Sequence, residues 1–310
     1  MESGCNEVSI DPLTGQPSMT AAIRCSMDSF SSRVPSRVTC IMCVDCCLPA
    51  ALAVSELMDE LRLGPVPVVS DLRLPGWISE DSTVILLSCS SDQAQAMVAY
   101  ERLKSRGAQV IPVLTRGELL AMCDRDGLGG SVLPDGPDED YPIGHAIGTM
   151  VAIIDAGGAD GVCDFVREQL STISLEDMGS VADSVAESLH GKVVSTYAPS
   201  DDLAVAMRWR IALGTASDEL TFMGELPEFD HNELVGWSDP NVHAPELMML
   251  VLKGARSDGL VQTIVDCMLE VLDENGRKVT VVDLGSGSSF ARCIRGMMLA
   301  DAVAKRVGGA

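Results

Sequence analysis

Residues 82–113 read STVILLSCSSDQAQAMVAYERLKSRGAQVIPV, and this stretch decides the fold class. The apolar runs 82–87 and 109–113 each predict a buried strand. Between them, residues 93–106 have the length and composition of a helix. A strand, a helix and a strand in succession are typical of a parallel sheet, because parallel neighbours need a crossover connection.

The same alternation recurs along the chain and predicts two similar α/β units. In the first half, strands are expected at 38–44, 66–70 and 130–133, and helices at 50–63 and 118–123. In the second half, strands are expected at 192–197, 219–223, 247–253 and 278–282, and helices at 174–190, 201–213, 260–272 and 288–307. We predict an N-terminal arm (1–35), a first domain (36–155) and a second domain (156–310).

Length, composition and net charge exclude several classes of function. The chain has 310 residues, 46% of them hydrophobic, which is enough for two domains with aliphatic cores. Its net charge of −23 argues against nucleic acid and anionic membranes as partners, since both attract basic proteins. No apolar run is long enough to span a bilayer, and no basic-then-apolar start indicates a signal peptide. We therefore expect a cytoplasmic protein whose eleven cysteines are reduced thiols.

Two sequence patterns resemble a metal site and a cofactor site, and we predict that neither binds such a group. Cys40, Cys43 and Cys46 have a C-x-x-C-x-x-C spacing, with Cys47 beside them, but no fourth ligand stands at a familiar offset. We read them as small hydrophobes at a strand end and expect no metal. Residues 279–288 look like a strand and glycine loop for a nucleotide cofactor, but such a loop opens its domain, so no cofactor is expected.

Three segments carry a resemblance to a known family: 225–237 with its His-Asn-Glu turn, 206–210 with its Arg-Trp-Arg run, and 74–91. Over about residues 35–305, the chain resembles the bifunctional phosphoglucose/phosphomannose isomerases. The resemblance implies two sugar isomerase (SIS) domains, each a three-layer α/β/α unit with a parallel sheet. It also implies a sugar phosphate ligand, aldose–ketose isomerisation and a homodimer.

The resemblance assigns phosphate binding to residues 88–93, where the family has Ser-Tyr-Ser-Gly-Asn-Thr. Ser88 and Ser90 match the two serines, and Gln93 stands for the threonine. Asp92 replaces the asparagine; it either repels a phosphate by its like charge or caps the following helix. The expected site therefore keeps the serines beside a new carboxylate.

The family's first loop, Gly-Met-Gly-Gly-Ser, falls at residues 42–46, and its glycines are absent here. Side chains at Val44 and Asp45 should obstruct a ligand that approaches the backbone, which glycine would allow. Cys46 takes the place of the serine and is a poorer donor. The resemblance thus implies a substrate-binding position at Cys46 with reduced function.

The position of the catalytic base is the largest departure. Thr215 stands where the family has a glutamate, soon after the run that contains Arg208, which the resemblance places at the substrate. Asp218 or Glu219 could replace the base. His231 matches the ring-opening histidine, although it also fits a purely structural turn. The family's arginine near 141–146 and its last helix, with a catalytic lysine, have no counterpart, so a truncated C-terminus is expected.

These features lead to one functional prediction with an alternative. The chain is expected to be a sugar-phosphate isomerase homologue with lost or weakened catalysis, that is, a pseudoenzyme. The alternative is a non-catalytic phosphosugar-binding regulator, or an assembly partner of an active isomerase.

Overall fold

The structure is a computed structural model that describes residues 18–32, 34, 37–90, 93–134, 141–217, 219–239, 247–254 and 259–309. Its internal contacts divide the chain into two compact units, Met1–Ser171 and Thr172–Ala310. The sequence-based boundary lay at 155/156. The helix α6 (Val162–Thr172) accounts for the difference, because the contacts group nearly all of it with the first unit.

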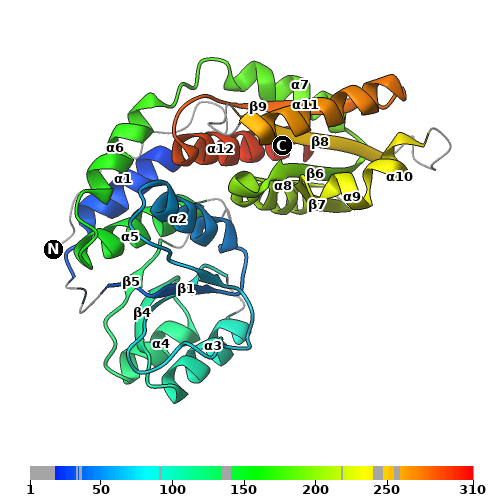
Figure 1. Cartoon of the computed structure of the whole chain (residues 1–310). Coiled ribbons are helices and arrows are strands. Elements are labelled where there is room, and N and C mark those ends of the chain that lie inside the picture. The colour runs from blue at the N-terminus through cyan, green and yellow to red at the C-terminus, as the bar shows by residue number, and fades with distance from the viewer. Residues whose placement is uncertain are drawn as a thin grey trace. The chain divides into compact units, whose positions relative to one another are not determined.

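The first unit contains a five-stranded parallel sheet in the order β2-β1-β3-β4-β5. The strands are β1 (Cys40–Cys43), β2 (Val68–Val69), β3 (Thr83–Ser88), β4 (Gln109–Leu114) and β5 (Ser131–Val132). Every pairing between neighbours is parallel, as residues 82–113 predict. The α/β fold class with parallel sheets is therefore confirmed for this unit (Figure 1).

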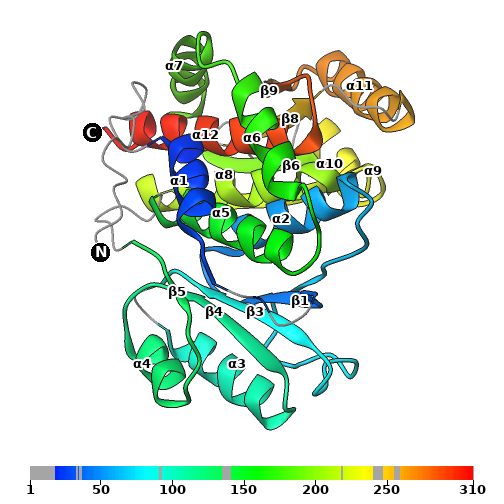
Figure 2. The same ribbon diagram turned by 90° about the vertical axis from the view of Figure 1, so that its left-hand side faces the viewer.

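Helices cover both faces of this sheet (Figure 2). On one side lie α3 (Ala94–Ser105) and α4 (Glu118–Arg125), whose apolar residues join a core cluster with alternate residues of β1 and β3. On the other lie α2 (Leu48–Glu60) and α5 (Tyr141–Ala156).

The helix α1 (Met19–Ser29) packs along α5, a helix that the sequence analysis did not predict. Gly148 makes the close approach possible, since a Cβ there would collide with the carbonyl oxygen of Ile23. The hydroxyl of Ser26 and Nδ1 of His145 lie 2.7 Å apart and join the two helices by a buried hydrogen bond.

The second unit contains a four-stranded parallel sheet in the order β7-β6-β8-β9. The strands are β6 (Val193–Pro199), β7 (Thr221–Leu226), β8 (Leu247–Gly254) and β9 (Val279–Gly285). The helices are α7 (Met178–Leu189), α8 (Leu203–Ala216), α9 (Phe229–Asn232), α10 (Leu234–Ser238), α11 (Gly259–Glu274) and α12 (Ser289–Val307). The sheet again confirms the predicted fold class.

In this unit α12 packs against α7 and α8, while α11 contributes Val265, Met268 and Leu272 to a core with Tyr197 and Phe229. Within the described residues, no helix is both long and apolar enough to cross a membrane.

Candidate functional site

Two loops meet at the carboxyl edge of the first sheet. The strands β1 and β3 are parallel neighbours, and Cys43 at the end of β1 lies opposite Leu87. The loop 44–47 therefore leaves the sheet beside residues 88–90, and each leads towards a helix, α2 or α3. Ligands of parallel α/β sheets bind at this edge, where main-chain N–H groups at helix starts favour anions.

One oxygen of Asp45 receives three hydrogen bonds from the loop after β3. The Ser88 hydroxyl donates to Oδ2 at 2.6 Å. The main-chain N–H groups of Cys89 and Ser90 donate to the same oxygen at 3.0 and 3.4 Å. The serines that the resemblance assigned to a phosphate thus make hydrogen bonds to a carboxylate of the chain itself.

The other oxygen of Asp45 receives donors from its own loop. The main-chain N–H of Cys47 donates to Oδ1 at 3.0 Å, and the Cys43 thiol lies 3.5 Å away as a further donor. Burial raises the pKa of Cys43 well above its ordinary value, and the charge of Asp45 raises it further. Cys43 therefore stays a thiol that can donate its proton.

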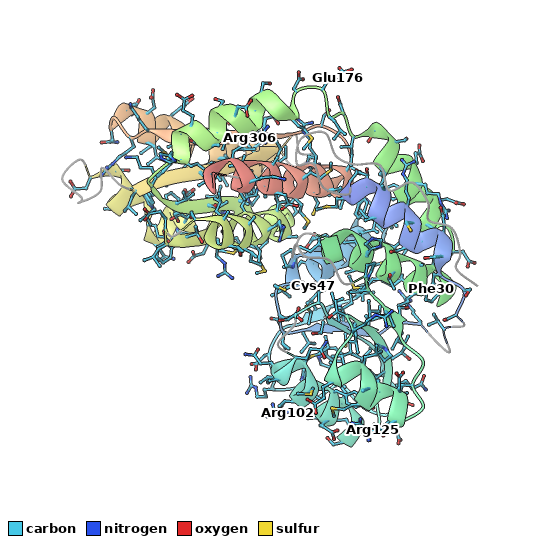
Figure 3. The ribbon with its side chains drawn as sticks, turned by 180° about the vertical axis from the view of Figure 1, so that it is seen from behind. Phe30, Cys47, Arg102, Arg125, Glu176 and Arg306 are labelled. Carbon is cyan, nitrogen blue, oxygen red and sulfur yellow. A yellow bond between two sulfur atoms is a disulfide. The ribbon has the colours of Figure 1, made fainter. Side chains whose placement is uncertain are left out.

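A disulfide joins the same two loops. Cys47 and Cys89 are bonded through their sulfurs, with their Cα atoms 5.9 Å apart (Cys47 is labelled in Figure 3). The prediction that all cysteines are reduced is therefore wrong: Cys47, Cys89 and Cys25 are disulfide-bonded. The sequence analysis assumed a reducing compartment and could not see that the β1–β3 register brings Cys47 to Cys89.

Cys46 lies half-buried beside this bridge and is not part of it. Ligand atoms of Asp45, Cys46 and Cys47 fall within 4.8 Å of one another. Because the Cys47 sulfur belongs to the disulfide, this group does not offer a pair of thiolates to a metal. Burial raises the pKa of Cys40 to about 12, which likewise favours a buried thiol.

Gln93 faces a different loop. Its Nε2 donates to the Thr115 carbonyl and hydroxyl at 3.4 and 3.5 Å, and its Oε1 accepts from the Leu119 N–H at 3.1 Å. The structure therefore brings Ser88 and Ser90 together with loop 44–47, and turns the Gln93 amide towards the end of β4. Asp92 lies outside the described residues.

In the second unit, the 225–237 segment begins in the last residues of β7 and continues through α9 into α10. His231 is exposed on α9, and its N–H donates to the Glu228 carbonyl at 3.1 Å. Asn232 donates to the Glu228 carboxylate. The imidazole of His231 is thus open to solvent in this unit.

Sequence reasoning missed a polar cluster beside His231. The Tyr197 hydroxyl donates to the Glu233 carboxylate, and Nε1 of Trp237 donates to that hydroxyl at 3.1 Å. The three side chains line a cavity of about 520 Å³. Burial, followed by the bond to Glu233, raises the pKa of Tyr197 to about 12. The four-residue spacing of Glu233 and Trp237 was the available signal, because it puts both on one helical face.

Comparison with known proteins shows which family this chain is similar to. Residues 179–307 match the bacterial phospho-glucose isomerase C-terminal SIS domain. A bifunctional phosphoglucose/phosphomannose isomerase from Aquifex aeolicus is 24% identical over 238 residues, which cover 76% of this chain and 73% of that protein. These matches support the chain as a divergent member of this isomerase family.

One further sequence relative and one solved structure are also similar to this chain. A D-glucosamine-6-phosphate 4-epimerase from Sulfolobus acidocaldarius is 23% identical over 219 residues, covering 68% of this chain and 69% of that protein. The C-terminal domain of glucosamine-fructose-6-phosphate aminotransferase from Francisella tularensis superposes with a TM-score of 0.71 at 10% identity, covering 94% of this chain and 92% of that one. That superposition supports two SIS-like domains, whereas the names of these relatives describe different activities.

Two positions that the resemblance assigned to the site, Arg208 at the substrate and Thr215 at the base, are on α8. Arg208 is 1% exposed, and its Nε donates to Asp301 of α12 at 2.6 Å. Thr215 is exposed in the last turn, and its hydroxyl donates to the Ile211 carbonyl at 2.9 Å. Arg208 is thus part of the core between two helices, and its role at a substrate stays a prediction, as does that of Thr215.

Proposed function

We propose that the protein is a sugar-phosphate isomerase homologue, of the glucose 6-phosphate/mannose 6-phosphate class, whose turnover is lost or strongly weakened. Family membership supports the substrate class. The observation on which the loss depends is Thr215, a neutral hydroxyl at the position of the base. No cofactor enters the proposal, because the isomerisation only moves a proton between two carbons.

The missing base matters because aldose–ketose isomerisation removes a proton from a carbon acid. A threonine hydroxyl cannot accept that proton near neutral pH, and the proton of Thr215 is already donated to the Ile211 carbonyl. Loss of a positioned base costs about two to four orders of magnitude in rate. Glu219 is exposed beyond the end of α8, and Asp218 lies outside the described residues. We retain His231 as the group that would open the sugar ring.

The test is turnover by the purified protein. Conversion of fructose 6-phosphate to glucose 6-phosphate is followed with a coupling dehydrogenase, and the Aquifex aeolicus relative serves as the active reference. We expect a rate at least about 10²-fold below that reference. A rate equal to the reference would refute the proposal.

The alternative is a non-catalytic role as a phosphosugar-binding regulator or as an assembly partner. Thermal shift with hexose phosphates tests the first role, because a ligand that binds the folded state raises its apparent stability. Co-purification with an active isomerase tests the second.

We also propose a homodimer and a cytoplasmic location. The proposed dimer is supported by family membership, and sedimentation should give twice the chain mass of 32.8 kDa. The proposed location follows from the proposed ligands, which are intracellular metabolites, and it makes the Cys47–Cys89 bond one of the disulfides that are rare in that compartment. Cell fractionation tests it, and recovery of the protein outside the cytoplasm would refute it.

A further inference from the structure

Five donors converge on the carboxylate of Asp45. We call them the Asp45 cradle: the Cys43 thiol, the Ser88 hydroxyl and the N–H groups of Cys47, Cys89 and Ser90. Three of these donors are main-chain groups whose positions are fixed by the ends of β1 and β3. A rigid, preorganised set of donors of this kind binds an anion.

The Asp45 cradle is more than a local turn. The bond from the Cys47 N–H spans two residues, as in an ordinary aspartate turn. The bonds from Ser88, Cys89 and Ser90 come instead from the end of β3 and the loop after it, more than 40 residues away. Ser88 is 0% exposed, so its hydroxyl depends on Asp45 as its acceptor.

Hydrogen-bond donors, rather than a described basic side chain, face this carboxylate. Among the side chains that the structure describes, Asp45 pairs with no Lys or Arg, and the cradle alone balances its charge. Hydroxyl and main-chain N–H donors at the carboxyl edge of a parallel sheet are also the groups that bind phosphates. Donors reach both carboxylate oxygens, as they would reach the oxygens of a bound anion.

We infer that Asp45 is an internal substitute for a phosphate group. Its carboxylate fills an oxyanion site in the first unit, and removal of that carboxylate opens the site to inorganic phosphate or to the phosphate end of a hexose phosphate. The inference rests on the proposed function only for the choice of hexose phosphate as a ligand.

The Cys47–Cys89 disulfide strengthens this arrangement. Both residues donate their N–H groups to Asp45, and their sulfurs are bonded to each other. The disulfide therefore holds loop 44–47 and residues 88–90 at a spacing that lets donors from both bind one anion. The same spacing remains when the Asp45 side chain is removed.

The experiment compares Asp45→Gly with wild type in rising inorganic phosphate at constant ionic strength, by titration calorimetry and by thermal unfolding. Asp71→Gly is the matched control, since Asp71 is exposed in the same unit and its carboxylate accepts one turn bond, from the Arg73 N–H at 2.9 Å. We expect Asp45→Gly to bind phosphate at least about tenfold more tightly than wild type and Asp71→Gly. Equal phosphate affinity in all three proteins would overturn the inference.

A folding defect does not make the result ambiguous. Asp45→Ser is a second variant that keeps a small polar side chain at the site. If either variant unfolds without phosphate and recovers its fold with it, the inference is supported, because the anion replaces the missing carboxylate. If neither recovers with phosphate, the inference is wrong. Phosphate binding is measured without any isomerase assay. An active wild-type enzyme would therefore refute the proposed function but not the inference about Asp45.

Discussion

The hydroxyl of Ser88 donates a hydrogen bond of 2.6 Å to the carboxylate of Asp45, and this bond links the end of β3 to the end of β1. A residue assigned to an external phosphate is thereby bonded to an internal anion. In the second unit, Thr215 replaces the proposed base by a hydroxyl that donates to its own helix. The positions that the resemblance assigned to phosphate binding and to the base thus both make hydrogen bonds within the chain, and each unit has a parallel sheet.

Restoring a carboxylate should restore proton transfer. We expect Thr215→Glu combined with Asp45→Gly to raise isomerisation of fructose 6-phosphate over Asp45→Gly alone by about 10²–10⁴-fold, the usual contribution of a general base. Thr215→Gln in the same background is the matched control, because it has the size of glutamate without its charge. Equal rates for the two double variants would show that position 215 does not supply the base.

Stability should fall below neutral pH because of His145. Burial lowers the pKa of His145 to about 4 from an ordinary value of 6.5. Between these values the unfolded chain binds the proton and the folded chain does not, so stability is full above pH 6.5 and declines as the pH falls towards 4, by at most about 3 kcal/mol.

Urea unfolding across this pH range measures the effect. His145→Gln should flatten the decline, whereas His190→Gln, at an exposed position, should leave it unchanged. The assignment to His145 fails if His145→Gln keeps the wild-type pH dependence.

The ion pair between Arg208 and Asp301 should act as a unit. Both side chains are buried, at 1% and 8% exposure, and Nε donates to Oδ1 at 2.6 Å. Arg208→Met leaves a buried carboxylate without its guanidinium and should cost about 3–5 kcal/mol. The double variant Arg208→Met/Asp301→Leu should recover much of that loss. Additive losses in urea unfolding would mean that the two residues are energetically independent.

The disulfide should be a large stabiliser of the first unit. Cys47 and Cys89 are 42 residues apart, and closing a loop of that length contributes about 4 kcal/mol by restricting the unfolded chain. Cys89→Ala should therefore lower the unfolding free energy by about that amount. Cys46→Ala, at the neighbouring thiol outside the disulfide, is the control. Unchanged stability after reduction by a dithiol would contradict this expectation.

Much of the fold followed from local pattern. Residues 82–113 predict β3, α3 and β4 to within one residue at each end, since each predicted segment has the length of its element. The helix α5 was missed because Pro142 and Gly144 at its start are typical of loops. The apolar residues of α5 are buried by packing against α1 and α2. These tertiary contacts cannot be seen in the local sequence pattern.

The candidate site was half predictable. The sequence indicated Ser88 and Ser90, and it marked Asp45 as an obstruction. It could not show that the β1–β3 register aims the Asp45 carboxylate at the Ser88 hydroxyl and the Cys89 and Ser90 N–H groups. The Cys47–Cys89 bond was hidden for the same reason, since residues on different strands become neighbours only through the sheet.

Hydrogen exchange at the sugar is the most direct test of the lost base. Wild-type protein is incubated with glucose 6-phosphate, mannose 6-phosphate or fructose 6-phosphate in D₂O, and NMR follows deuterium at the first and second carbons. This reports proton removal even when no net product forms. We predict incorporation no faster than in buffer alone. Deuterium entering either carbon at the rate set by an active relative would contradict the account.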